Sequence, residues 1–182
     1  IVGTLPQPRF TTGELRPGDV NFCYGSRDGQ LWPIIDRIFD LHLPFEATDK
    51  AIAKRKEFLR NHGIGICDIV ASARRDKIDA SDLGMSDVKL RDLVKILKDH
   101  ASIHTLLFMG GNSKNGPEYF FRKLVKSYGI TYSKIKDEVP RIHEFLLPNS
   151  SRTIKTVSLT APSGAANRAV GSLAAYKEMK SV

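Results

Sequence analysis

The sequence predicts an α/β protein, a three-layer α/β/α sandwich with a central four-stranded parallel sheet. Four short runs of Val, Ile, Leu and Phe have the length and composition of buried strands. The segments between them carry apolar residues at helical spacing, and this alternation indicates a parallel sheet covered by helices on both faces. The 182 residues, 41% hydrophobic and 26% charged, fit one domain over residues 1–182.

The predicted strands end at small, polar or proline residues, which form turns. In chain order the strands are Ile1–Leu5, Ile64–Val70, His104–Met109 and Ile154–Thr160. Ligands of open parallel sheets bind at the carboxyl ends of the strands, so the segments that follow these four are where we expect functional residues.

Helices are predicted where apolar residues recur every three or four positions. A glycine that follows Asn61 and His62 is a plausible C-cap for the second of them. The stretch 128–149 is compatible with a helix and an added edge strand through Ile142–Leu147. The predicted helices cover Leu31–Phe39, Ile52–Leu59, a segment from near Val88 to Leu97, Phe120–Val125, and a last one through Leu173–Tyr176.

The charge is unevenly distributed along the chain. The net charge is +8; residues 1–100 hold 16 Lys and Arg against 15 Asp and Glu, and residues 101–182 hold 12 against 5. A cationic half favours a polyanion partner, because contacts to phosphates release counterions. The alternative is a protein that is basic without such a partner.

Composition excludes several other classes of protein. Two cysteines, Cys23 and Cys67, cannot hold an iron–sulfur cluster or an all-cysteine zinc site. They form no disulfide framework, which fits a reducing compartment and a cytoplasmic location. No run approaches the about 18 apolar residues that span a bilayer, so we expect no membrane partner. The five histidines lack metal-ligand spacing, and we expect neither metal nor cofactor. The chain begins Ile-Val-Gly without Met or a signal-like segment, so we expect a processing boundary or further residues upstream.

Two segments near the N-terminus carry candidate binding groups. In the first, Gly3–Pro8, a glycine and prolines at a strand end can bring backbone close to a ligand, or simply form the strand exit. In the second, Phe22–Asp28, Tyr24 could stack on a planar base and Arg27 could meet a phosphate. The alternative places Tyr24 and Trp32 in the core and pairs Arg27 with Asp28.

Two later segments have similar character. Gly110–Glu118 exposes backbone N–H groups at the predicted start of a helix, which attracts anions or carbonyl oxygens, and Asn112 could read a base edge. It lacks the Gly-Lys-Ser/Thr ending of a phosphate-binding P-loop. Thr160–Ala169 is rich in small residues and could press against a duplex backbone. The alternatives are a capped turn and a flexible helix cap.

Taken in order, these segments resemble the uracil-DNA glycosylase superfamily, most closely its mismatch-specific and hypoxanthine branches. The resemblance spans nearly the whole chain and depends on the order of its motifs. The matching residues are Gly3-Thr4-Leu5-Pro6, Tyr24 eight residues before Trp32, Gly63-Ile64 with Asp68, Ala71 and Ser72, Phe108 to Asn112, and Pro162-Ser163 with Ala166-Asn167.

The resemblance implies a single glycosylase-like domain that hydrolyses the N-glycosidic bond of a deaminated or mismatched base, uracil or hypoxanthine, in base-excision repair of DNA. No lysine nucleophile is evident, so we expect a monofunctional enzyme. It also implies a monomer that acts on damaged DNA, on the nucleoid if the protein is bacterial. The alternatives are a non-catalytic nucleic-acid-binding protein and a nucleotide-binding α/β enzyme on the same fold.

The resemblance also implies roles for particular residues. Leu5 stands where many members place a water-positioning Asn or Asp, so the candidates for handling water are elsewhere. The catalytic candidates are Gln7, Asp28 and Asp68; the base-binding candidates are Gly3, Thr4, Leu5, Pro6, Tyr24, Gly110 and Asn112; the DNA-binding candidates are Arg27, Ser72, Lys114, Pro162, Ser163, Asn167 and Arg168.

Overall fold

The computed structural model describes residues 1–75 and 84–162, and its chain divides into two compact units. We call residues 1–5 and 66–161 the sheet unit, and the part that holds residues 6–65 and Pro162 the helical unit. The predicted helix through Leu173–Tyr176 and the predicted DNA-binding residues Ser163, Asn167 and Arg168 lie outside the described residues.

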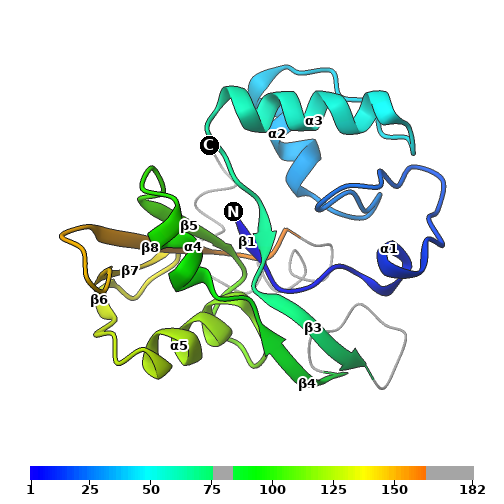
Figure 1. Cartoon of the computed structure of the whole chain (residues 1–182). Coiled ribbons are helices and arrows are strands. Elements are labelled where there is room, and N and C mark those ends of the chain that lie inside the picture. The colour runs from blue at the N-terminus through cyan, green and yellow to red at the C-terminus, as the bar shows by residue number, and fades with distance from the viewer. Residues whose placement is uncertain (76–83, 163–182) are drawn as a thin grey trace. The chain divides into compact units, whose positions relative to one another are not determined.

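The sheet unit contains a mixed six-stranded sheet in the order β2-β1-β5-β8-β7-β6 (Figure 1). The strands β2, β1, β5 and β8 run parallel to one another, whereas β7 pairs antiparallel with β8, and β6 pairs antiparallel with β7. The bounds are β1 Val2–Gly3, β2 Cys67–Asp68, β5 Thr105–Met109, β6 Ser133–Lys136, β7 Arg141–Leu146 and β8 Thr153–Leu159.

The α/β class is confirmed, but the prediction of a sheet with only four parallel strands is wrong. All four predicted strands are present and parallel, and β6 and β7 extend the sheet beyond β8. Within residues 128–149, the expected helix is replaced by β6, and the expected edge strand, β7, lies between β8 and β6. Residues 137–140 join β6 to β7, and residues 147–152 join β7 to β8. Connections this short can join neighbouring strands only in antiparallel pairs, which accounts for the directions of β6 and β7.

The second predicted strand is also shorter than expected. Only Cys67–Asp68 pairs with β1, and the chain then continues as β3, Val70–Arg75, into a two-stranded antiparallel ribbon with β4, Met85–Leu90. The helix predicted from near Val88 therefore begins later, as α4, Leu93–Asp99. The Asp92 side chain accepts a hydrogen bond from the Lys95 backbone N–H at 2.9 Å and so caps that helix.

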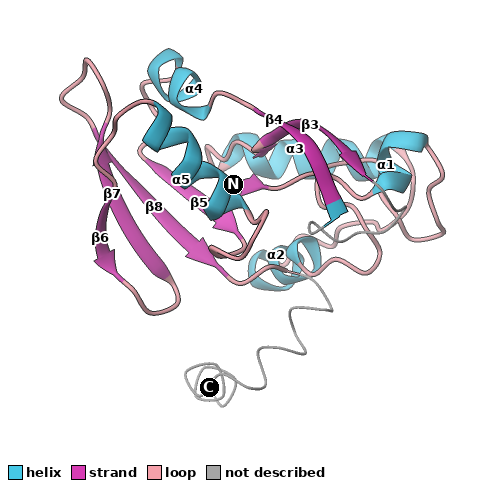
Figure 2. Cartoon of the chain, turned by 90° about the horizontal axis from the view of Figure 1, so that it is seen from below, coloured by secondary structure: helices cyan, strands magenta, loops and turns pink. Residues whose placement is uncertain are grey.

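Helices α4 and α5 bury the apolar side chains of the sheet unit. Helix α5 covers Pro117–Ser127, as its apolar spacing predicts, and runs along the sheet (Figure 2). The ring of Phe121, which is fully buried, lies 5.1 Å from that of Phe108 in β5 and 5.6 Å from that of Phe145 in β7. These aromatic contacts pack α5 against β5 and β7.

The helical unit contains α1, Pro8–Thr12, α2, Leu31–Phe39, and α3, Asp49–Asn61. Helices α2 and α3 are present where the apolar spacing predicts them, but Ile34, Ile38 and Phe39 of the predicted α2 stripe are exposed. Trp32 is buried, packs edge-on against Phe58 at 6.3 Å and donates its indole N–H to the Cys23 carbonyl at 2.7 Å. Trp32 therefore belongs to the core, as the alternative interpretation held.

Candidate functional site

A cavity of about 290 Å³ lies at the carboxyl ends of three parallel strands of the sheet unit. Thr4 follows β1, Gly110 to Ser113 follow β5, and Thr160 and Ala161 follow β8. Its volume is near the lower end of the range for small-molecule sites, which suits a compact ligand. The remaining lining residues are Met109, Gly116, Pro117, Val139, Arg141, Ser158 and Leu159.

Two glycines allow the chain to turn tightly from β5 into α5 beside this cavity. Gly110 has a φ of 154°, and a Cβ at this position would lie 3.0 Å from Cδ of Pro117. A Cβ on Gly116 would lie 2.5 Å from the carbonyl oxygen of Gly111. Pro117 occupies the first turn of α5, where its missing N–H has no partner to lose. The sequence therefore brings the N-terminus of α5 to the cavity wall.

Arg141 is the single charged side chain among the described residues that line the cavity, and it is already paired. Its Nη1 lies 2.9 Å from Oε2 of Glu118, a fully buried residue in the first turn of α5. Arg122 binds the other carboxylate oxygen, Oε1, at 2.8 Å. The wall of the cavity is therefore close to neutral.

A buried polar network continues behind this ion pair. Arg122 Nη2 lies 2.7 Å from Nε2 of His143, which is 1% exposed. Burial, together with the Arg122 cation, lowers the pKa of His143, so the neutral imidazole accepts this hydrogen bond. The His143 ring stacks on Tyr132 at 4.4 Å, and burial raises the pKa of Tyr132 to about 12. This network holds Arg122 and, through Glu118, Arg141 in place.

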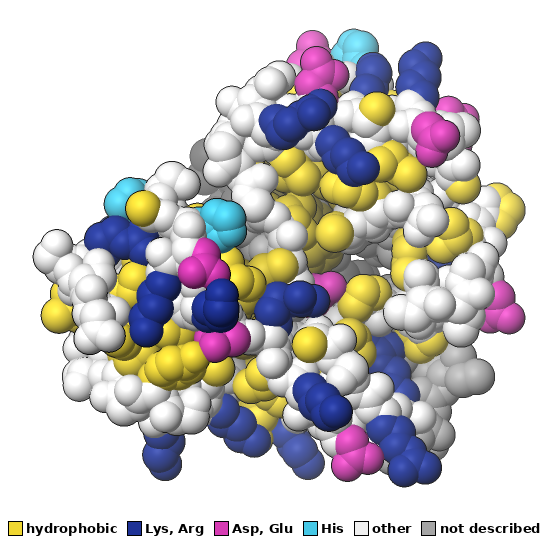
Figure 3. All heavy atoms as spheres, in the orientation of Figure 1, with side chains coloured by type: hydrophobic (Ala, Val, Ile, Leu, Met, Phe, Trp, Pro, Cys, Tyr) yellow, Lys and Arg dark blue, Asp and Glu magenta, His cyan; other side chains and the backbone are white. Residues whose placement is uncertain are grey.

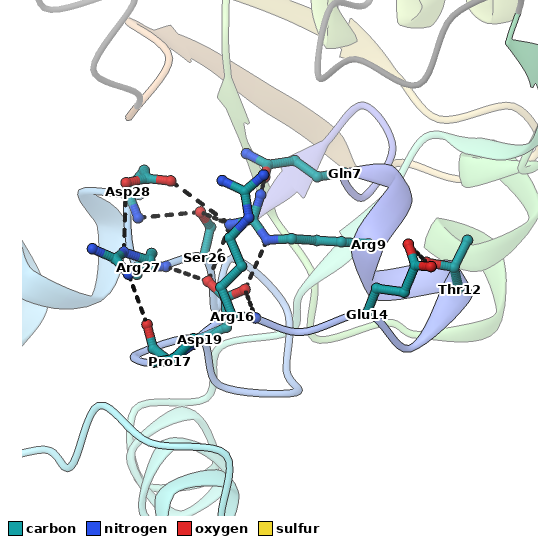
Figure 4. A network of polar contacts seen from close by, with 10 residues as sticks. All are labelled: Gln7, Arg9, Thr12, Glu14, Arg16, Pro17, Asp19, Ser26, Arg27 and Asp28. Carbon is teal, nitrogen blue, oxygen red and sulfur yellow. Dashed lines mark hydrogen bonds and ion pairs between the residues drawn. The ribbon is translucent and has the colours of Figure 1, made fainter.

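The helical unit contains a second polar cluster, centred on Arg9 and Asp19 (Figure 4). Arg9 binds both carboxylate oxygens of the fully buried Asp19, at 2.7 and 3.0 Å. The backbone N–H groups of Arg16 and Arg27 donate to the same oxygens at 2.9 and 2.8 Å. The Arg9 hydrogen bond and these backbone donors hold the pKa of Asp19 well below its usual range.

Arg9 also joins two of the predicted catalytic residues. Its Nη1 donates to Oε1 of Gln7, and its Nη2 donates to Oγ of Ser26 at 2.7 Å. The same Nη2 lies 3.8 Å from Oδ2 of Asp28 (Figure 4). Gln7 and Asp28 are therefore brought together around one guanidinium.

Sequence reasoning missed both members of the central ion pair. Two features of the sequence could have pointed to this ion pair. Arg9 directly follows the Gly3–Pro8 segment, and Asp19 directly follows Pro17-Gly18, a pair of residues that favours a turn.

Of the predicted base-binding residues, Thr4, Gly110 and Asn112 line the cavity together. Gly3 is buried within β1, and Leu5 packs against the core of the sheet unit. Pro6 and Tyr24 belong to the helical unit. Pro6 is exposed, and Tyr24 is half-buried with a φ of 57°.

The other predicted residues are spread over both units. In the sheet unit, Asp68 lies in β2, where its carbonyl accepts from Nε of Arg91 at 3.0 Å, and Ser72 is exposed in β3. Lys114 is exposed in the turn before α5. In the helical unit, Arg27 keeps 51% of its side chain exposed, and the Pro162 carbonyl accepts from the Gln30 N–H at 3.0 Å.

Comparisons of the chain with protein-family models, with curated proteins and with solved structures found no match. Among the described residues, no cluster of three His, Cys, Asp or Glu side chains could hold a metal ion. Within the same residues, no helix has both the length and the apolar character needed to cross a membrane.

Proposed function

We propose that the protein is a monofunctional DNA glycosylase that hydrolyses the N-glycosidic bond of a deaminated or mismatched base, uracil or hypoxanthine. The observation that carries this proposal is the cavity at the ends of β1, β5 and β8. Thr4, Gly110 and Asn112, three residues expected to contact a base, come from two distant segments and line that one cavity.

The character of the cavity wall supports a flipped base as the ligand. A base is a flat, neutral ring with polar atoms on its edge, and enzymes that act on it take it out of the helical stack into a close-fitting pocket. The cavity has apolar walls, several neutral polar groups and one arginine that Glu118 already pairs. This wall favours a neutral ring over a phosphate, and so favours a glycosylase over an enzyme of free nucleotides.

The proposed reaction needs a water and a stabilised leaving group. The C1′–N bond breaks, its electron pair leaves with the base, water oxygen bonds to C1′, and a proton from that water passes to the departing base. Oriented N–H dipoles at the start of α5 would stabilise the developing negative charge. Tyr24 is assigned the stacking of the extruded base.

Of the three catalytic candidates, Asp28 is best suited to take this proton from the water and pass it to the departing base. Oε1 of Gln7 accepts from Arg9, which directs the remaining amide N–H groups of Gln7 to donate. The Asp28 side chain is 66% exposed, so its carboxylate is accessible to solvent and substrate. Asp68 remains an alternative on β2.

We also propose that the protein binds DNA as its partner through exposed cationic and polar residues. Lys and Arg side chains are spread over the face drawn in Figure 3, with acidic side chains among them. Arg27 and Lys114, both exposed, are proposed to contact phosphates, and Ser72 is proposed to contact the DNA. Pro162, Ser163, Asn167 and Arg168 are proposed to fill or brace the gap that the extruded base leaves in the duplex. The enzyme would carry helices on both faces of the sheet, as a three-layer sandwich, and act as a monomer on DNA in the cytoplasm or on a nucleoid.

The test is a lesion panel. Labelled single-stranded and duplex oligonucleotides, each with one uracil, hypoxanthine or mismatched base, are incubated with the protein and treated with alkali. We expect strand breakage only after alkali, at the lesion, and none in lesion-free oligonucleotides. If none of the oligonucleotides breaks and the protein still binds DNA, the protein is a non-catalytic nucleic-acid binder. Breakage without alkali would instead indicate a lyase and contradict the monofunctional assignment.

A further inference from the structure

Arg141, the first residue of β7, lines the cavity, and part of its guanidinium is not used by the fold. Nη1 binds Glu118 at 2.9 Å, and Nε donates to the Asp137 carbonyl at 3.3 Å. No group among the described residues accepts a hydrogen bond from the remaining nitrogen, Nη2. The side chain is 26% exposed, and Nη2 is not one of the buried side-chain atoms that lack a partner, so Nη2 is accessible. Its N–H groups therefore remain available to a ligand.

Two carboxylates hold this guanidinium in place and balance its charge. Glu118 is fully buried and also binds Arg122 at 2.8 Å. Oδ1 of Asp137 lies 3.4 Å from Nε of Arg141, and Lys134 binds Oδ2 of Asp137 at 2.8 Å. The network thus joins three cations and two carboxylates, and its net charge is small. A fixed N–H donor with little net charge around it suits a neutral acceptor, such as a carbonyl oxygen, better than a phosphate.

We propose that Arg141 determines specificity by donating an Nη2 hydrogen to the carbonyl oxygen at the ring position that deamination changes, C4 of a pyrimidine or C6 of a purine. This inference rests on the proposed function and names the residue that selects its substrates. Uracil and hypoxanthine carry an oxygen there, whereas cytosine and adenine carry an amino group. A guanidinium always donates and never accepts, so an amino group would place donor against donor.

The first measurement uses the wild type alone. The full chain is titrated by NMR with hypoxanthine, adenine and unsubstituted purine, which has neither group at C6, and with uracil and cytosine. We expect hypoxanthine to bind about tenfold more tightly than adenine or purine, and uracil about tenfold more tightly than cytosine, as for one hydrogen bond from a charged donor. This comparison does not depend on the folding of any variant.

The second measurement uses a matched pair of variants. Arg141→Met removes the proposed donor, and Glu118 keeps its ion pair with Arg122. It should bind hypoxanthine and uracil about tenfold more weakly and bind adenine and cytosine as the wild type does. The control is Arg122→Met, which removes the other arginine on Glu118 but not a residue of the cavity wall. It should melt at a lower temperature and keep the wild-type preference for the oxo bases.

Several results would overturn the assignment of Arg141. Equal binding of hypoxanthine, adenine and purine by the wild type would do so, and so would no binding of any base. A preference for oxo bases that Arg141→Met keeps, or that Arg122→Met loses to the same extent, would show that Arg141 does not make the contact. Inorganic phosphate that displaces bound hypoxanthine would show an anion site instead.

The lesion panel, run on the same preparation of wild type, separates this inference from the proposed function. Binding of oxo bases that depends on Arg141, without release of base from DNA, would retain the role of Arg141 and reject the glycosylase. Release of base from DNA by a protein that binds oxo and amino bases equally would retain the glycosylase and reject the role of Arg141.

Discussion

At the scale of single residues, the arginine that joins Gln7 to Asp28 is itself fixed by Asp19. This carboxylate is fully buried, accepts two bonds from Arg9 and two from backbone N–H groups, and ties together the turns around residues 16 and 27. Removing one partner of such a pair leaves a buried charge without its counterion, which is more costly than losing an exposed ion pair.

The first prediction concerns this pair. Asp19→Asn should lower the free energy of unfolding by about 3 kcal/mol at neutral pH, because the Arg9 guanidinium, whose side chain is only 15% exposed, loses its carboxylate partner. The matched control is Asp99→Asn, which breaks an exposed pair with Lys95 and should cost much less stability. Urea denaturation of both variants measures the difference. Equal losses would contradict the structural role of Asp19.

The pH dependence of stability provides an independent check on Asp19. Its pKa is lowered in the folded state, so the unfolded chain takes up the proton first as the pH falls. The stabilisation by Asp19 is therefore complete above about pH 5 and declines below about pH 4. The wild type should lose more stability than Asp19→Asn in this acidic range.

The second prediction concerns the proposed stacking residue. Tyr24→Ala should lower the rate of base release about tenfold or more, because stacking of a base on an aromatic ring is worth about 1–3 kcal/mol. Tyr24→Phe keeps the ring and should retain most of the activity. Single-turnover release from a lesion-bearing oligonucleotide measures both. Full activity of Tyr24→Ala would show that Tyr24 does not stack on the base.

At the scale of elements, the turn from β5 into α5 shapes the cavity. Gly110 combines a positive φ with a close approach to Pro117, whereas Gly111 beside it has open space around its Cα. The two neighbouring glycines therefore differ in what a side chain would meet, and they form a matched pair for substitution.

The third prediction uses this pair. Gly110→Ala should lower the free energy of unfolding by about 1–3 kcal/mol, because the added Cβ is strained and presses on the Pro117 ring. Gly111→Ala should change it by no more than about 0.5 kcal/mol. Denaturant titration distinguishes them. Similar stability of the two variants would mean that the turn tolerates a side chain at both positions.

The elements also show which parts of the fold the sequence could predict. The apolar spacing of α2, α3 and α5 and the apolar run of β5 are strong local signals, and each of these helices and this strand is present as predicted. The β3–β4 ribbon was missed because Val88 and Leu90 fit a helix extended backward from Leu93 as well as they fit a strand. Strand β6 is exposed throughout, so it has no apolar pattern to detect.

At the scale of the whole molecule, part of the candidate site follows from topology. Parallel strands end at one edge of a sheet, so Thr4, Gly110 and Asn112 could be expected to meet, and they line one cavity. Arg141 and Glu118 could not be paired from the sequence, because the expected edge strand, β7, gave no sign that it pairs antiparallel with β8 or that Arg141 at its start meets α5.

The fourth prediction concerns the net charge of +8 and the proposed DNA partner. Affinity for duplex DNA should fall steeply with salt, because each phosphate contact contributes about 0.9 to the slope of log K against log salt. Lys114→Ala should reduce this slope by about one unit. Lys95→Ala, whose ammonium is paired with Asp99, should leave it unchanged. Salt-independent binding would contradict the phosphate contacts.

The most direct test of the account is detection of free base by mass spectrometry. The wild type is incubated with duplex DNA that carries one uracil or hypoxanthine, beside Asn112→Ala, which changes an exposed residue of the cavity wall. We predict release of the free base by the wild type and about a hundredfold slower release by Asn112→Ala, with DNA affinity retained. Bound duplex that yields no free base, or equal release by both proteins, would contradict the proposal that this cavity receives the base.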